Sequence, residues 1–116
     1  MKYPVFVLIT LVAGAAHAAD RLPTAMLGAW ASDPAACGEQ ASELAMTVEP
    51  RMVLFYEHGL EVRRVVRLRD GAVRASGFAV ADGERMPGSL TLKMIDDKLR
   101  VGEETYHRCK SEKRKE

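Results

Sequence analysis

The residue types that most often carry out chemistry are few in this sequence and lack the spacing that chemistry needs. Beyond residue 20 the histidines are His58 and His107, which stand far apart and have no third ligand at a zinc-type spacing. No G-x-S-x-G motif and no phosphate-binding glycine pattern surrounds the serines at 32, 42, 76 and 89. We therefore expect a protein that is not an enzyme and that needs neither a metal nor a cofactor.

Two cysteines, Cys37 and Cys109, are present in the whole chain. They do not form the C-x-x-C spacing of a redox pair or a metal thiolate site. In an oxidising compartment, two such cysteines form one disulfide. The sequence thus predicts a bridge that ties the last strand to the N-terminal region.

The first 18 residues predict a secretory signal peptide. Met1-Lys2 is a short basic start, residues 5–12 are apolar, and Ala16-His17-Ala18 is a cleavage pattern. The apolar run is about half of the roughly 20 residues that a membrane-spanning helix needs. Because no cysteine follows Ala18 directly, a lipid anchor is not expected. We expect a soluble periplasmic or secreted protein with no membrane span after cleavage.

Length and charge indicate one small domain. The 116 residues are 47% hydrophobic, with 17 Lys+Arg against 16 Asp+Glu. Since Lys2 is the one Lys, Arg, Asp or Glu residue among the first 18, cleavage leaves basic and acidic residues equal, which is not typical of a nucleic-acid binder. Residues 110–116 are nearly all charged and predict a disordered tail. The folded domain is then 19–109.

Apolar residues recur with a period of two from Leu27 onward, in short runs separated by turn residues. We expect a turn of helix after Asp33-Pro34, a loop through Pro87-Gly88, and turns at His58-Gly59 and at 70–71, 82–83 and 96–97. The predicted strands are 27–32, 44–49, 52–57, 60–69, 72–81, 90–94, 99–101 and 105–109. Seven or eight antiparallel strands of this length close most readily into a small up-and-down β-barrel.

The cleanest alternation follows Gly59. One face carries Leu60, Val62, Val66 and Leu68, and the other carries Glu61, Arg63, Arg67 and Arg69. Arg64 interrupts this pattern because it falls on the apolar face. Either a β-bulge turns it outward, or it points inward and pairs with an acid such as Glu49 or Glu57. Small residues around Gly77 favour tight curvature in the next strand.

Leu27-Gly28-Ala29-Trp30, together with Tyr106 and Arg108, resembles the Gly-x-Trp start and the last strand of lipocalin-like (calycin) barrels. That resemblance implies that Trp30 and Arg108 plug one end of the barrel. Residues 22–109 as a whole resemble small uncharacterised exported bacterial proteins. The residues that carry this resemblance are Asp33-Pro34, Cys37, Phe55-Tyr56-Glu57, Gly71 and Tyr106-x-Arg108-Cys109. A looser likeness is to periplasmic inhibitor barrels, which block proteases or lysozymes and share the early Gly-x-Trp and a following cysteine.

Two functions fit these observations. The first is a non-catalytic binding module that inhibits or docks on an envelope or foreign protein. Its predicted docking face is a basic stripe across the 70–71 hairpin, although such a stripe also serves as a solvated face that discourages aggregation. The stripe residues are Arg63, Arg67, Arg69 and Arg74.

The alternative function is a carrier of a small apolar ligand inside the barrel. The candidate lining residues are Trp30, Phe55, Tyr56, Phe78 and Tyr106. The small size of the domain opposes this alternative, because aliphatic side chains fill so narrow an interior.

Overall fold

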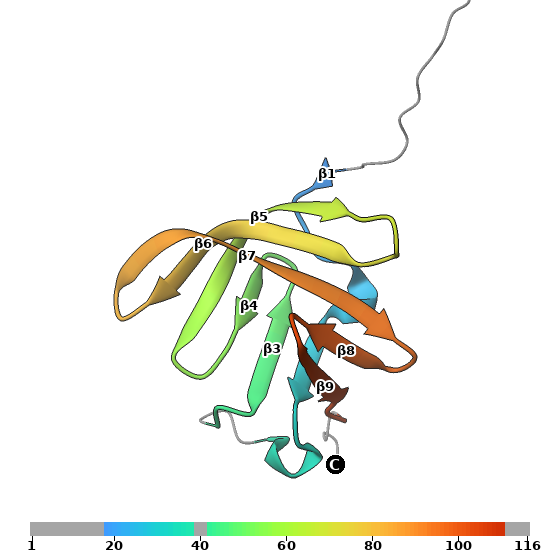
Figure 1. Ribbon diagram of the computed structural model, residues 1–116. Helices are drawn as coiled ribbons and strands as arrows, with labels where there is room; N and C mark the ends of the chain where they lie inside the picture. The colour runs from blue at the N-terminus through green and yellow to red at the C-terminus, as the bar shows by residue number, and fades with distance from the viewer. Residues whose placement is uncertain (1–17, 39–41, 111–116) are drawn as a thin grey trace, which may run out of the picture.

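The computed structural model describes residues 18–38 and 42–110, which form a closed antiparallel β-barrel (Figure 1). Each strand from β2 to β9 pairs with the next along the chain, and β9 pairs back with β2. This confirms the predicted up-and-down meander of seven or eight strands, and the number in the barrel is eight. Their bounds are β2 Gly28–Ala31, β3 Ala45–Glu49, β4 Met52–Leu54, β5 His58–Arg67, β6 Val73–Ala81, β7 Glu84–Ile95, β8 Lys98–Val101 and β9 Glu104–Arg108.

Three short elements complete the barrel. Strand β1 (Ala18–Ala19) pairs with Val66 and Val65 of β5. In the sheet order β5 therefore lies between β1 and β4. Two 3-10 turns, η1 (Thr24–Met26) and η2 (Pro34–Ala36), flank β2. The predicted signal peptide, apart from Ala18, and the predicted tail, apart from Lys110, lie outside the described residues. Among residues 18–38 and 42–110, no helix has the length and apolarity needed to cross a membrane.

A β-bulge in β5 decides the position of Arg64. The register with β6 shifts between Val62 and Arg64, so Arg63 is the extra residue. Arg64 is therefore exposed. Of the two predicted alternatives, the β-bulge that turns Arg64 outward is confirmed, and the inward-pointing arginine is not. After the bulge the core residue is Val65, 4% exposed, whereas Val66, predicted to face inward, lies on the outer face.

The backbones of β5 and β6 approach each other so closely at Gly77 that no other residue fits there. A Cβ atom there would collide with the backbone carbonyl of Glu61 on β5. Gly77 also pairs with Gly88 of β7, so two residues without side chains face each other where the strands bend. The curvature predicted from the small residues of this strand is explained by this pair.

Two local predictions were wrong. Strand β4 ends at Leu54, and the chain turns through 55–57, because the Phe55 amide donates to the carbonyl of His58 at 2.8 Å. His58-Gly59 thus begins β5 instead of forming the turn. The loop expected at Pro87-Gly88 is also wrong, since β7 runs through both residues.

Pro87 is tolerated in β7 because it lies on a free edge. Strand β8 pairs with Leu92–Ile95 alone, so no strand among the described residues pairs with the outer edge of Glu84–Thr91. The two-residue turn at Asp82-Gly83 (φ 54° and 78°) makes Ala81 and Glu84 a hydrogen-bonded pair. By alternation, the Pro87 nitrogen faces the free edge, where it offers no donor to another strand.

We expect Pro87→Thr to promote self-association, because the new N–H completes a row of donors on this exposed edge. Sedimentation velocity should show a concentration-dependent dimer or larger species that the parent protein lacks. Ser89→Thr, also on the edge but already a donor, is the matched control. A Pro87→Thr variant that stays monomeric at the same concentrations would show that proline does not protect this edge.

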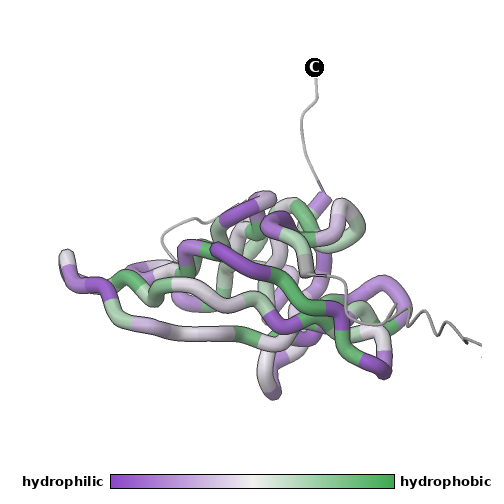
Figure 2. Tube along the Cα trace, turned by 90° about the horizontal axis from the view of Figure 1, so that it is seen from above, coloured by the Kyte–Doolittle hydropathy of each residue, from purple (hydrophilic) through white to green (hydrophobic). Residues whose placement is uncertain are grey.

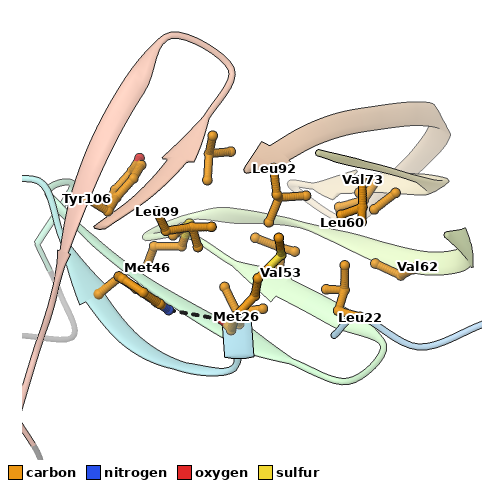
Figure 3. Packing of buried hydrophobic residues seen from close by; sticks show 14 of the residues in the cluster. Leu22, Met26, Met46, Val53, Leu60, Val62, Val73, Leu92, Leu99 and Tyr106 are labelled. Carbon is orange, nitrogen blue, oxygen red and sulfur yellow. Dashed lines mark hydrogen bonds between the residues drawn. The ribbon is translucent and has the colours of Figure 1, made fainter. Parts of the chain in front are cut away.

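The barrel interior is filled by its own side chains (Figure 3). Aliphatic, methionine and aromatic residues from every strand from β2 to β9 meet there. The largest residues under 2% exposed are Trp30, Met46, Leu92, Leu99, Val48, Val53 and Val73. By contrast, the tip of the β6–β7 hairpin projects away from the barrel and is hydrophilic (Figure 2).

Candidate functional site

The two residues predicted to plug the barrel, Trp30 and Arg108, are in contact with each other. Trp30 is fully buried, and its indole N–H donates to the Met26 carbonyl at 3.1 Å. The Arg108 guanidinium lies 4.2 Å from the centre of the Trp30 ring. It also donates to the carbonyls of Leu27 (2.9 Å) and Ala25 (2.7 Å). The arginine thus satisfies backbone acceptors around η1.

The predicted disulfide joins Cys37 to Cys109, with a Cα–Cα distance of 5.5 Å. It fixes the β2–β3 connection against the end of β9. As predicted, Asp33 caps the turn of helix before it, since its carboxylate accepts from the Ala35 amide at 3.0 Å. Beneath η2, Ala31 is fully buried although its side chain points away from the interior.

The candidate ligand-lining aromatics are not brought together. Trp30 and Tyr106 belong to the packed core, where burial raises the pKa of the Tyr106 hydroxyl, with a smaller contribution from Glu104. Phe55 stacks on His58 with 4.8 Å between ring centres, and Tyr56 is 39% exposed. Phe78 lies on the outer face of β6. These residues therefore do not line one internal cavity.

A hollow of about 460 Å³ lies outside the barrel, next to the disulfide. Its lining includes Ala29 and Thr47, which share the outer face of β2 and β3, with Leu54 of β4 and Cys109. Phe55 and Trp30 are the candidate lining residues that border it.

The predicted basic stripe is divided by the strand register. Arg74 lies opposite Val66 on the outer face, whereas Arg67 lies opposite Val73, a core residue. Directly opposed residues of an antiparallel pair share a face, so Arg67 and Arg74 are on opposite faces. Arg69 lies in the β5–β6 turn. The stripe was wrong because the sequence does not place the bulge.

A different set of arginines shares one outer face of β5, β6 and β7. We call it the arginine face: Arg63, Arg64, Arg74 and Arg85, all exposed. Hydroxyl side chains separate them, because Arg64 lies opposite Ser76, which lies opposite Ser89, and Arg74 lies opposite Thr91. Sequence reasoning missed Arg64, which was assigned to the apolar side, and Arg85, which was placed at the start of a loop.

Phe78 is the centre of the most ordered part of this face. The guanidinium of Arg85 lies 4.5 Å from the Phe78 ring centre, and that of Arg63 lies 5.4 Å from it. Glu61, opposite Phe78 on β5, holds both arginines through one carboxylate oxygen, at 2.8 Å from Arg85 and 3.7 Å from Arg63. Two guanidinium groups, one ring and one carboxylate thus form a single cluster.

Other ion pairs lie around the arginine face. Asp20 binds Arg51 at 3.2 Å, and Asp70 lies 3.6 Å from Lys93. The pKa of Asp70 is lowered, chiefly because its carboxylate accepts from the Ala72 amide and also because Lys93 is near. In the part of the chain that the structure describes, no group of three or more His, Cys, Asp or Glu residues is placed to hold a metal.

No family model matches the chain, and neither curated proteins nor solved structures give a significant match. The closed eight-stranded barrel is consistent with a lipocalin-like fold. An inference about function therefore has to come from the geometry of the protein surface.

Proposed function

We propose that this protein is a non-catalytic binding module of the periplasm, or of another oxidising compartment, that docks an acidic protein partner on its arginine face. The observation that carries the proposal is the gathering of four exposed guanidinium groups on one sheet face, where Glu61 contacts two of them, those of Arg63 and Arg85. Arginine and aromatic side chains are enriched in protein interfaces. The disulfide supports the oxidising compartment.

The packed interior favours docking over transport of a small apolar ligand. Trp30, Met46 and Leu92 are at most 2% exposed and occupy the space in which such a ligand would lie. A carrier would need these side chains to move together. The outer face requires no such rearrangement before a partner binds.

We expect Arg64→Glu combined with Arg74→Glu to weaken binding of a fluorescent deca-glutamate peptide at least about tenfold, because attraction becomes repulsion. Both side chains are exposed, so the melting temperature should stay near that of the parent protein. Fluorescence anisotropy at low and physiological salt measures the affinity. Rising salt should weaken the parent complex and leave the variant nearly unchanged.

The matched control makes the same change in net charge elsewhere. Lys98 and Lys110 line a separate hollow beside His107, on the β8–β9 side. Lys98→Glu with Lys110→Glu should therefore leave peptide binding close to that of the parent protein. Equal losses in the two double variants, or no measurable binding by the parent protein, would contradict docking on the arginine face.

A further inference from the structure

We infer that Arg63, Phe78 and Arg85 form a carboxylate clamp, held open by Glu61, that receives an acidic side chain from an extended segment of the partner protein. This inference rests on the proposed function and assigns the anchoring point within the arginine face. The clamp lies where β5, β6 and β7 run side by side, with Glu61, Phe78 and Pro87 in one cross-strand row.

The guanidinium groups of the clamp keep donors free for a ligand. An arginine has five N–H donors. Within residues 18–38 and 42–110, Arg85 makes one side-chain hydrogen bond, to Glu61, and Arg63 approaches the same oxygen only at 3.7 Å. The side chains are 47% and 61% exposed, respectively. Donors of both groups therefore reach solvent, where a second carboxylate can accept from them in bidentate fashion.

The clamp is ordered before a ligand arrives. Glu61 fixes the two guanidinium groups from one side, and the Phe78 ring supports them from another. A free arginine side chain loses rotamer freedom when it binds, and that loss weakens affinity. Two arginines already held in place lose less. Glu61 and Phe78 thus act as positioning residues for Arg63 and Arg85.

An acidic polypeptide fits this surface better than a membrane does. The planar fork of arginine matches a carboxylate, and both cations of the clamp are arginines. Phe78 is half-buried beneath the two guanidinium groups, so it is not free to enter a bilayer. Ser76 and Ser89, in the next row, offer hydroxyl groups to the backbone of an extended segment.

Glu61→Gln separates the clamp from simple charge attraction. The substitution adds one positive charge to the arginine face, so attraction alone predicts tighter binding of the deca-glutamate peptide. The clamp predicts weaker binding, by about three- to tenfold, because Arg63 and Arg85 lose the group that positions them. Asp70→Asn adds the same charge beside Lys93, outside the clamp, and should leave affinity unchanged or slightly improved.

Phe78→Leu gives an independent measurement, because it keeps an apolar side chain and removes the ring face. We expect a similar weakening of peptide binding with an unchanged melting temperature.

If Glu61→Gln tightens binding as Asp70→Asn does, or if Phe78→Leu has no effect, the clamp is wrong while docking on the arginine face stands. If Arg64→Glu with Arg74→Glu also has no effect, the proposed function fails. Binding of phosphatidylglycerol vesicles but not of the peptide would overturn the protein partner.

Discussion

Replacement of Cys37 and Cys109 by serine is expected to lower the free energy of unfolding by about 4 kcal/mol and the melting temperature by roughly 20 °C. The disulfide spans 72 residues of sequence, so it removes much of the conformational freedom of the unfolded chain. Domains of about 90 residues have an unfolding free energy of roughly 5–15 kcal/mol. The bridge thus contributes a large part of the stability, which chemical denaturation of both proteins measures.

The position of the bridge strengthens this expectation. The two cysteines flank the seam between β2 and β9, where the barrel closes and where two residue pairs, Trp30 with Arg108 and Ala31 with His107, are in register. The Cys109 amide also donates to the Ala29 carbonyl at 2.9 Å. We expect amide hydrogen exchange in the serine variant to rise first along this seam.

Reduction of the parent protein provides the control for the disulfide. Dithiothreitol should lower its stability to that of the double serine variant and should not affect the variant itself. A loss of less than about 1 kcal/mol would show that the unfolded chain is already compact enough to make the bridge redundant. Different stabilities of the reduced protein and the variant would instead indicate that the serine side chains disturb the folded state.

Much of the fold follows from short-range sequence signals. Asp70-Gly71 and Asp82-Gly83 form turns as predicted, with the glycines at φ 91° and 78°. The Asp70 carboxylate closes its own turn by accepting from the Ala72 amide. Asp33 caps η2 for the same local reason. These signals need only neighbouring residues, so one sequence contains them.

The arginine face depends on contacts that are remote in sequence. The bulge at Arg63 reverses the faces of all later residues of β5, because side chains alternate with a period of two. Arg85 reaches Phe78 because β7 continues through Pro87, and the general rule that proline interrupts a strand does not reveal a free edge. The sequence therefore predicted a basic outer face with Arg63 and Arg74, but not that Arg64 and Arg85 join it in place of Arg67 and Arg69.

The aromatic residues illustrate the same limit. Their types did not indicate that Tyr106 enters the core, that Phe78 stays outside beneath two arginines, or that Tyr56 lies in an exposed turn. Trp30 was the exception, since the Gly-x-Trp pattern and the arginine of the last strand together implied a plug at one end. A pair of signals from both ends of the chain was needed to place one side chain.

Trp30→Ala is expected to destabilise the protein by about 4 kcal/mol, because it removes the largest fully buried side chain and leaves a cavity. It also leaves the Met26 carbonyl without the indole donor at 3.1 Å. Trp30→Phe should cost about half as much, since it fills most of the volume and loses chiefly this hydrogen bond. Equilibrium unfolding in urea, followed by far-ultraviolet circular dichroism, compares the two variants.

The contact between Trp30 and Arg108 is tested by a double-mutant cycle with Trp30→Phe and Arg108→Met. Arg108→Met keeps a long side chain but leaves the Ala25 and Leu27 carbonyls without their donors. If the guanidinium stabilises the indole ring above which it lies, the two losses should differ from additivity by about 0.5–1 kcal/mol. Strict additivity would mean that Arg108 acts through the carbonyls alone.

In both single variants the deca-glutamate peptide should bind as in the parent protein, because the Trp30–Arg108 pair and the arginine face are built from different residues. A loss of peptide binding in either variant would show that the Trp30–Arg108 pair and the arginine face are energetically coupled.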